Sequence, residues 1–344
     1  MVWQNDPYSV TIFEILIKKS IDAERESGMS SYAIDDDFKD ALALLPTHSD
    51  FSTVEKVQKI RALRAEAAGA IKNRDDVEKE DRIIPGPDGA QEVPIRIYQP
   101  VGKAPLGCIF EIHGGGFIFG SIDQMDPWCQ RASADVGCVV VSVEYRLAPE
   151  NPFPAGLEDC YAALCWTAEH ASELGIDTQR LAIAGHSAGG GLAAATALLA
   201  RDRGAPALCF QLLEIPELDD RLQTPSMTAF TDTPVWNRPN AEWSWRHYLG
   251  PDHVGDGDGE VSQYAAPARA TDLSNLPPAY ISTMEFDPLR DEGILYAMAL
   301  MQAGVSVELH SYAGTFHGST QIGSADASRR NLAETMGILK RRLV

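Results

Sequence analysis

The sequence predicts an α/β fold in which a mostly parallel central sheet is flanked by helices and covered at one end by a helical cap. From about residue 80 onward, short runs rich in β-branched residues alternate with stretches of helical spacing. The runs are apolar along most of their length, as expected of parallel strands that helices cover on both faces. A long segment, residues 217–260, interrupts this alternation and is rich in Asp, Pro and Trp.

The expected strands and helices follow one another at intervals typical of β–α–β units. Strands are expected at residues 93–99, 106–113, 138–145, 180–185, 208–214, 279–285 and 305–311. Helices are expected at residues 126–136, 156–173, 187–203, 290–302 and 325–343. Parallel strands joined in this way bring their carboxyl ends to one edge of the sheet, where such folds bind ligands.

Two regions outside the alternating strands and helices are expected to form a cap. The first 80 residues look helical, with apolar side chains at helical spacing in 10–24 and 53–71. The later insertion contains an expected helix at 239–249, and an insertion at the strand ends is where a lid would lie. We therefore divide the chain into an N-terminal cap region at 1–80, a core at 81–216 and 261–344, and a cap insertion at 217–260.

The charge of the chain argues against two classes of partner. Its 29 Lys and Arg residues against 49 Asp and Glu residues give a formal net charge of −20. The resulting field repels nucleic acid and anionic membrane surfaces, so we expect neither as a partner. No stretch approaches the roughly 20 apolar residues of a membrane helix. The N-terminus lacks the basic region of an export signal, so we expect a cytoplasmic protein.

The six cysteines fall between Cys108 and Cys209, mostly inside apolar segments, and no two of them form a CxxC pair. Buried free thiols in a reducing compartment explain this distribution more simply than disulfides or a zinc site. We therefore expect all six to be unpaired and to bind no metal.

The stretch GHSAGG, residues 185–190, places Ser187 where an apolar strand gives way to an alanine-rich helix. In such a turn the serine adopts a strained conformation that only small neighbours such as Gly185 and Gly189 tolerate. Its hydroxyl then points out of the sheet, above a helix N-terminus that favours negative charge. This context predicts a nucleophile, and a plain structural turn is the alternative.

A serine hydroxyl needs a base, and a carboxylate that orients the base, before it can attack a carbonyl. Of the eight histidines, His317 lies in a small glycine-containing loop beyond the last expected strand, at the same sheet edge as Ser187. Asp287 is the first carboxylate after the preceding strand, whereas Asp291 fits better in the first turn of the next helix. The order Ser187, Asp287, His317 is that of an α/β-hydrolase.

The stretch HGGGF, residues 113–117, directly follows an expected strand. Three glycines allow backbone N–H groups to turn toward a substrate, as stabilisation of an oxyanion requires. We expect Gly114 and Gly115 to donate, with the N–H of Ala188 as a third donor. A phosphate-binding loop is the alternative, but the full GxGxxG and Walker patterns are missing.

Five motifs, taken in order, resemble those of the bacterial hormone-sensitive lipase family of carboxylesterases: HGGGF at 113–117, EYRLAPE at 144–150, GHSAGG at 185–190, DPLRDE at 287–292 and FHG at 316–318. The resemblance implies the α/β-hydrolase fold with a cap, and hydrolysis of short- to medium-chain carboxylic esters without metal or cofactor. The residue roles that it implies are Ser187 as nucleophile, His317 as base, Asp287 as its partner, and Gly114, Gly115 and Ala188 as oxyanion donors.

The resemblance also implies a small-molecule ester as the substrate, and a homodimer, because family members often pair through the last strand and helix. Two other functions stay open. Amides or lactones could be hydrolysed by the same triad, or the fold could bind a small molecule without catalysis. The presence of His317 argues against binding alone, because receptors of this fold have lost the triad histidine.

Two residues depart from the family pattern. His186 stands where an aspartate usually precedes the serine, and Ser319 follows the His–Gly pair where an aromatic residue is usual. We favour a structural role for His186 over that of a second base, because its side chain should point away from the neighbouring hydroxyl. The run 214–220 is unusually acidic, and we interpret it as a solvated hinge of the cap. The alternative is a carboxylate that faces the pocket and favours cationic substrates.

The cap sequence leaves two further interpretations. We expect Trp236, Trp243, Trp245 and Tyr248 to hold the cap on the sheet, the alternative being that they line the pocket. The Gly- and Asp-rich stretch 255–260 resembles a calcium loop but lacks the required glutamate spacing, so we expect a flexible acidic linker.

Overall fold

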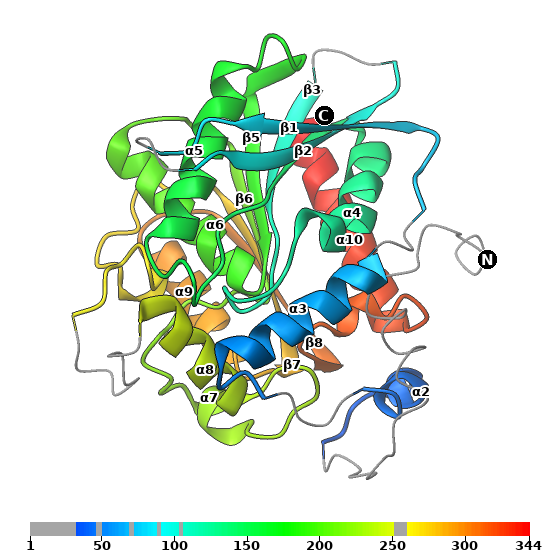
Figure 1. Ribbon diagram of the computed structural model, residues 1–344, viewed down its shortest axis with the longest axis vertical. Helices are drawn as coiled ribbons and strands as arrows, with labels where there is room; N and C mark the ends of the chain where they lie inside the picture. The colour runs from blue at the N-terminus through cyan, green and yellow to red at the C-terminus, as the bar shows by residue number, and fades with distance from the viewer. Residues whose placement is uncertain (1–31, 46–49, 69–71, 88–90, 103–105, 251–259) are drawn as a thin grey trace.

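The computed structural model describes residues 32–45, 50–68, 72–87, 91–102, 106–250 and 260–344. Within these residues the chain folds around one eight-stranded sheet with helices on both faces (Figure 1). The expected α/β architecture, with a mostly parallel sheet, is therefore confirmed.

All seven strands expected from the sequence are present, and one more precedes them. The strands span Val77–Ile84 (β1), Val93–Pro100 (β2), Leu106–Ile112 (β3), Val139–Val143 (β4), Ile176–His186 (β5), Phe210–Glu214 (β6), Ala279–Phe286 (β7) and Val307–Phe316 (β8). Their order in the sheet is β1-β2-β4-β3-β5-β6-β7-β8. The pairs from β4 through β8 are parallel, whereas β1–β2 and β2–β4 are antiparallel.

The expected core helices are also present, with ends that shift by a few residues. The helices span Lys39–Leu42 (α2), Val54–Ala68 (α3), Ile122–Ala132 (α4), Ala155–Glu169 (α5), Ala188–Arg203 (α6), Pro225–Ala229 (α7), Arg238–Leu249 (α8), Arg290–Gln302 (α9) and Asp326–Leu343 (α10). α4 and α10 lie on one face of the sheet, and α5, α6 and α9 lie on the other (Figure 1). Each face buries its own apolar core, which is the main driving force for folding.

Strand β1 was not expected, because its sequence VEKEDRII is dominated by charged residues. It lies at the edge of the sheet and pairs with β2 along its whole length, burying only Val77 and Ile84 at its two ends. Ion pairs hold it to its neighbours: Arg96 on β2 bonds Asp81, and Lys79 bonds Asp126 on α4. An edge strand of this kind has no apolar run by which periodicity could detect it.

The cap helices α3 and α8 cross the end of the sheet at which the parallel strands finish (Figure 1). The Arg61 side chain on α3 donates to the carbonyl oxygens of Ile118 at 2.8 Å and Ala148 at 2.6 Å, which fastens the helix to the core. Both helices match those expected from the sequence, whereas the helix expected at 10–24 lies outside the described residues. The division of the chain into cap and core stays a prediction.

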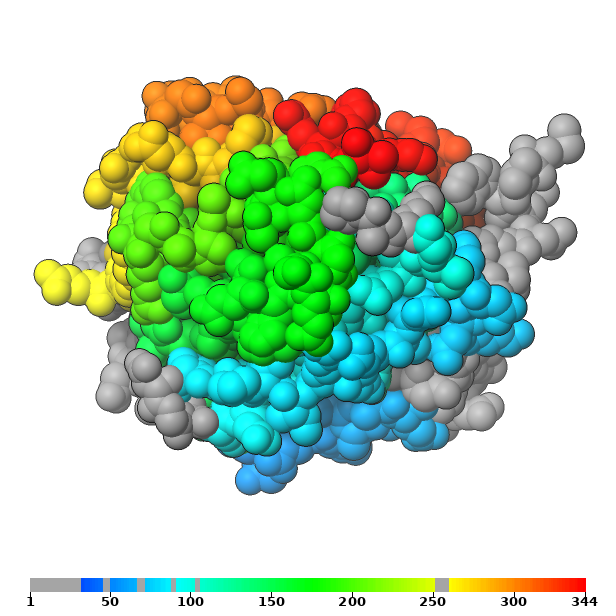
Figure 2. Space-filling view, turned by 90° about the horizontal axis from the view of Figure 1, so that it is seen from above, coloured from blue at the N-terminus to red at the C-terminus, as the bar shows by residue number. Residues whose placement is uncertain are grey.

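At the other end of the molecule, β1 and β2, the α5 region and the C-terminal helix share one surface (Figure 2). In the described ranges no helix has the length and apolar character needed to span a membrane. All six cysteines are free thiols, and four of them are buried, as expected. Among these same residues no group of three His, Cys, Asp or Glu side chains is arranged to hold a metal ion.

Candidate active site

Ser187 lies at the sharp turn between β5 and α6, with the unusual backbone angles φ 56° and ψ −123°. The turn requires two glycines, because the backbone on either side packs against other backbone. A Cβ at Gly189 would lie 2.1 Å from the carbonyl oxygen of Ile112, and one at Gly185 would lie 2.0 Å from that of Gly189. A non-glycine residue held at positive φ is strained, and such strain is typical of functional turns.

Three side chains expected to act together meet at this turn. The Ser187 Oγ lies 3.0 Å from Nε2 of His317, and Nδ1 of His317 lies 2.7 Å from Oδ2 of Asp287. The other Asp287 oxygen accepts a hydrogen bond from the N–H of Leu289 at 2.9 Å. An ionised carboxylate only accepts, so the His317 hydrogen is on Nδ1, and Nε2 is left to accept from the serine hydroxyl. All three are at least 93% buried, with Asp287 fully so: their exposed fractions are 7% for Ser187, 5% for His317 and 0% for Asp287.

The topology of the sheet explains why residues so distant in sequence meet. Ser187 follows β5, Asp287 follows β7 and His317 follows β8. These strands are parallel, so the residues that follow them emerge at the same edge of the sheet. Asp291, by contrast, lies in the first turn of α9 and accepts from the N–H of Ser226, as expected of a carboxylate at a helix N-terminus.

The glycine loop lies directly beside the serine. A Cβ on Gly114 would lie 3.3 Å from the Cβ of Ser187, and Gly115 has φ 134°, a conformation that favours glycine. Within the described residues neither of their N–H groups donates a backbone hydrogen bond. Ala188 is the first residue of α6, where a helix leaves N–H groups without intrahelical partners. The three expected oxyanion donors are therefore on the loop and the helix end that flank Ser187.

Comparison with known proteins agrees with this geometry. A family model described as the alpha/beta hydrolase fold matches residues 109–321. Carboxylesterase NlhH of Mycobacterium tuberculosis is 43% identical over 260 residues, covering 74% of this chain and 81% of the relative. Esterase LipI of the same organism is 41% identical over 241 residues, covering 69% and 73%. The solved structure of a bacterial heroin esterase superposes with a TM-score of 0.87 at 51% identity, covering 91% of this chain and 98% of that one.

This chain belongs to the hormone-sensitive lipase-like family of α/β-hydrolases. The resemblance seen in the sequence is thereby confirmed. Relatives that are at least 40% identical carry the names of carboxylesterases and esterases, and the chain is a carboxylic ester hydrolase. The departures from the family pattern can now be located in the structure.

The first departure, His186, points away from the serine, as expected. Its Nε2 lies 2.7 Å from Oε2 of Glu214 on β6, and its Nδ1 lies 3.8 Å from Oε1 of Glu111 on β3. The edge of Trp128 covers the ring. Burial alone would lower the pKa of His186, but bonding and charge from the two glutamates outweigh it and raise the pKa to about 9. The imidazole is therefore a cation between two carboxylates at neutral pH.

The acidic run 214–220 is not a solvated hinge, and that interpretation was wrong. Glu214, Glu217, Asp219 and Asp220 are all buried. Three of them are compensated: Glu214 by His186, Asp219 by Arg221 and Asp220 by Arg269. The interpretation failed because composition shows only that charges are present, whereas Glu214 and Asp220 are paired with residues that lie elsewhere in the chain.

Glu217 is the residue near the site that the sequence did not single out. Both of its carboxyl oxygens are buried and make no hydrogen bond within the described residues. Nearby, the hydroxyl of Ser244 on α8 donates to the carbonyl oxygen of Gly116 at 2.9 Å. In the sequence, Glu217 stands out only as one of several acids in the run 214–220, and no pattern points to Ser244.

Two of the four aromatic residues, Trp245 and Tyr248, pack on the glycine loop, as expected, and Trp236 also reaches the site. The rings of Tyr248 and Phe117 stack with centroids 3.9 Å apart, and Trp245 packs 5.2 Å from the same phenylalanine. Trp236 lies with its ring centroid 5.8 Å from that of His317, so it is also a wall of the site. The neighbouring stretch 251–259 lies outside the described residues.

The other histidines have local partners or lie outside the described residues. His170 stacks on Trp166, and His310 pairs with Glu334. Nε2 of His247 lies 2.7 Å from the carbonyl oxygen of Phe51 in the cap. His48 and His253 lie outside the described residues. Ser319, the second departure from the family pattern, is fully buried in the turn after His317.

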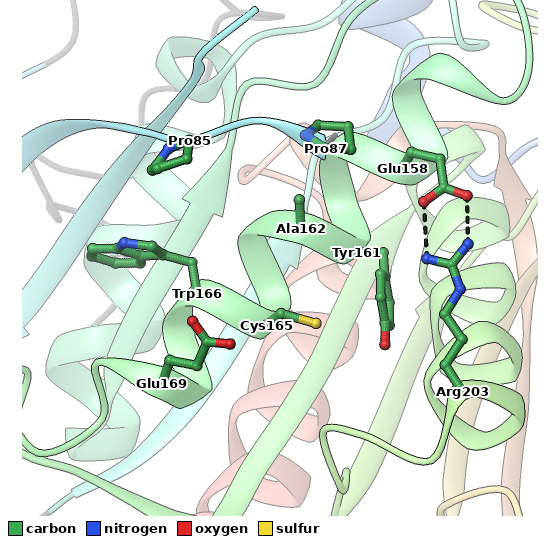
Figure 3. Close-up of a pocket in the computed structure, with 9 residues that line it drawn as sticks. All are labelled: Pro85, Pro87, Glu158, Tyr161, Ala162, Cys165, Trp166, Glu169 and Arg203. Atoms are coloured by element: carbon green, nitrogen blue, oxygen red, sulfur yellow. Dashed lines mark hydrogen bonds and ion pairs between the residues drawn. The ribbon is translucent and has the colours of Figure 1, made fainter. Parts of the chain in front are cut away.

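A surface groove of about 320 Å³ lies apart from these residues, along α5 and the segment after β1 (Figure 3). Its side chains are already engaged with one another: Arg203 bonds Glu158 at 2.7 Å and stacks over the ring of Tyr161. None of the residues near Ser187 lines it. Because its charged side chains already pair with one another, we do not assign the reaction to this groove.

Proposed function

We propose that this hydrolase cleaves short- to medium-chain carboxylic esters through an acyl-enzyme formed on Ser187. The observation that supports the proposal is the hydrogen-bonded row of Ser187 Oγ, His317 and Asp287, with steps of 3.0 Å and 2.7 Å. A nucleophile, a base and an orienting carboxylate in this geometry are the requirements for acyl transfer by serine.

In the first half of the proposed reaction, His317 Nε2 accepts the hydroxyl proton as Ser187 Oγ attacks the ester carbonyl carbon. Asp287 keeps the other imidazole hydrogen on Nδ1 and stabilises the cation that forms. The carbonyl oxygen becomes an oxyanion, which the N–H groups of Gly114, Gly115 and Ala188 bind. Collapse of this intermediate breaks the ester bond, and His317 gives its proton to the alcohol as it leaves.

In the second half, a water molecule takes the place of the alcohol. His317 accepts a proton from the water as its oxygen attacks the acyl carbon, and the same N–H groups bind the second oxyanion. Return of the proton to Ser187 releases the carboxylic acid and restores the enzyme. Apart from the ester and the water, each step uses side chains and backbone groups of this chain. Oxyanion donors contribute a factor of about 10²–10³ each in such reactions.

The first prediction tests the nucleophile. Ser187→Ala should lower kcat on a p-nitrophenyl short-chain ester at least about 10⁴-fold, because no other group can form the acyl-enzyme. A fluorophosphonate probe should label the parent chain once and leave the variant unlabelled. Ser306→Ala, an exposed serine before β8, is the matched control and should behave as the parent. Retained turnover in the folded Ser187→Ala variant would contradict the proposal.

A substrate panel decides between the chemistries that share this triad. Acyl esters from acetate to decanoate should be turned over faster than lactones and amides of the same acyl group. Labelling by the probe without turnover of any of these substrates would favour a binding protein.

We also propose that the chain forms a homodimer through its last strand, β8, and through α9 in place of the last helix, α10, that the family resemblance implies. β8 is the last strand of the sheet, and Leu309 on it is exposed. α9 beside it exposes Leu295, Met298 and Met301, which are three residues apart and share one helix face. An apolar helix face beside the last strand of the described sheet fits a second copy of itself, because a two-fold axis brings the same surface of both copies together.

The second prediction is therefore that light scattering after size-exclusion chromatography gives twice the chain mass at micromolar concentration. Met298→Glu should shift the protein to the monomer, since a charge would be buried in the interface. A monomer for the parent chain would contradict the dimer and leave the proposed chemistry untouched.

A further inference from the structure

Trp236 contacts both the base and the glycine loop of the site. Its ring centroid lies 5.8 Å from that of His317, with an angle of 32° between the two ring planes. The same ring meets the glycine loop, where a Cβ at Gly116 would lie 2.4 Å from Cη2 of Trp236. The indole therefore bridges the proposed base and the loop that carries two of the proposed oxyanion donors.

The cap holds this indole in a fixed position. Phe51, in the segment before α3, stacks with the Trp236 ring at a centroid distance of 6.1 Å. The backbone of Trp236 is also held, because its carbonyl oxygen accepts from the Thr233 hydroxyl at 2.7 Å and its N–H donates to the Pro234 carbonyl oxygen at 2.7 Å. Val235 before it has φ 67°, a strained value for a β-branched residue. Such a turn persists only where the surrounding structure determines it, so the ring is a fixed wall.

The space beside the reacting atoms is narrow. The exposed fractions are 7% for Ser187, 5% for His317 and 6% for Trp236, so an ester that reaches the serine must fit closely between these side chains. Packed protein interiors deform little, and a side chain that bounds such a space therefore selects substrates by size.

The proposed mechanism indicates which part of the ester meets Trp236. The oxyanion points toward the N–H groups of the glycine loop and the helix end. The alcohol oxygen must approach Nε2 of His317, because that atom gives it the proton on departure. The acyl chain takes the remaining direction on the tetrahedral carbon. A ring packed against both His317 and Gly116 therefore bounds the alcohol group rather than the acyl chain.

We propose that Trp236 is a specificity-determining residue that limits the bulk of the alcohol group of the ester. The inference rests on the proposed function, and it narrows the substrate class to esters of small or flat alcohols. A flat aromatic alcohol fits because it lies along the face of the indole, whereas a bulky aliphatic ring of the same size collides with it.

The third prediction concerns Trp236→Ala, measured as kcat/KM by titration of the released acid. The substrates are acetates of three primary alcohols: methyl, benzyl and cyclohexylmethyl acetate. In the parent chain the cyclohexylmethyl ester should be the slowest. Trp236→Ala should raise the ratio of cyclohexylmethyl to methyl acetate at least about tenfold, because even one methylene in an apolar pocket changes kcat/KM by about that factor. Methyl acetate, butyrate and octanoate should keep their ratios within about twofold, since the acyl chain does not meet the ring.

Three further variants make the test specific. Trp243→Ala removes the same kind of side chain from the same cap, but Trp243 stacks with His247, so both substrate series should match the parent. The buried indole N–H of Trp236 makes no hydrogen bond within the described residues, and Trp236→Phe removes it while an aromatic wall remains. That variant should shift the alcohol ratio less than about threefold. Trp236→Leu keeps an apolar side chain against Phe51 and replaces the alanine variant if that one does not fold.

The outcomes separate this inference from the proposed function. An unchanged alcohol ratio in Trp236→Ala overturns the inference, and so does an equal or larger shift in the acyl series. A Trp236→Phe variant that matches the alanine variant also overturns it, because the indole N–H rather than the bulk of the ring would then decide. In each of these cases probe labelling of Ser187 still supports the chemistry. Loss of probe labelling in the parent chain would refute the proposed function instead.

Discussion

Two histidine–carboxylate pairs lie on either side of Ser187, and they differ in what their second nitrogen meets. His317 and Asp287 approach to 2.7 Å, and so do His186 and Glu214. In the first pair the remaining nitrogen faces the Ser187 hydroxyl at 3.0 Å. In the second pair the remaining nitrogen faces another carboxylate, Glu111, at 3.8 Å.

The comparison shows that contact with a carboxylate does not by itself make a histidine a base. A base must keep one nitrogen unprotonated and aimed at the proton that it will accept. His186 has acids on both sides, so it is held as a cation and has no lone pair to offer. The position next to the nucleophile is the wrong one for a base here, because His186 ends β5 with its ring beside Glu214 and Glu111, whereas Ser187 lies in the turn that follows.

The fourth prediction is the largest effect expected from this comparison. His317→Ala should lower kcat at least about 10⁴-fold, because the serine loses its base. His186→Gln should lower the kcat of the folded protein less than about tenfold, since its side chain does not touch the reacting atoms. Initial rates on one neutral ester, corrected for the folded fraction by circular dichroism, provide the measurement. Equal losses of kcat in the two variants would contradict the distinction between the two histidine–carboxylate pairs.

The fifth prediction concerns stability, which we expect substitution of His186 to affect more than it affects kcat. His186→Gln removes the cation between Glu111 and Glu214, both buried, and should lower the free energy of unfolding by about 3 kcal/mol at pH 6. Adding Glu214→Gln should recover part of this loss, because one uncompensated acid is removed. Urea unfolding of the parent chain and the two variants gives the values.

The stability lost in His186→Gln should depend on pH, in a direction that follows from the pKa of His186. The pKa of His186 is about 9 in the folded chain, and that of an unfolded histidine is about 6.5. The stabilisation from this histidine is therefore fully present below about pH 6.5 and disappears as the pH rises through 9. The difference between the parent chain and His186→Gln should shrink over this window. A difference that grows toward pH 9 would mean that the histidine is neutral when folded.

Much of the fold and of the candidate site could be predicted because the relevant signals are local. Apolar runs identified every core strand, and the Ser187 turn needed only two glycines and a strand-to-helix change. Asp287 and His317 were recognisable because each directly follows a strand, and the family motifs supported the same choice. Strand β1 was missed because an exposed edge strand has no apolar run, and a ladder of ion pairs with β2 and α4 holds it instead.

The sequence by itself determined the order of elements, the residues at the strand ends, and the family, since these follow from periodicity and short motifs. Only the tertiary structure decided the state of the buried acids. The run 214–220 looked solvated, yet its four acids are buried, and Glu214 and Asp220 have partners from α10 and the 267–269 turn. Whether a carboxyl group is a cation's partner, a proton donor or a hydrated charge depends on which groups surround it and how much water is excluded. Those surroundings come from distant segments, so no local pattern contains them.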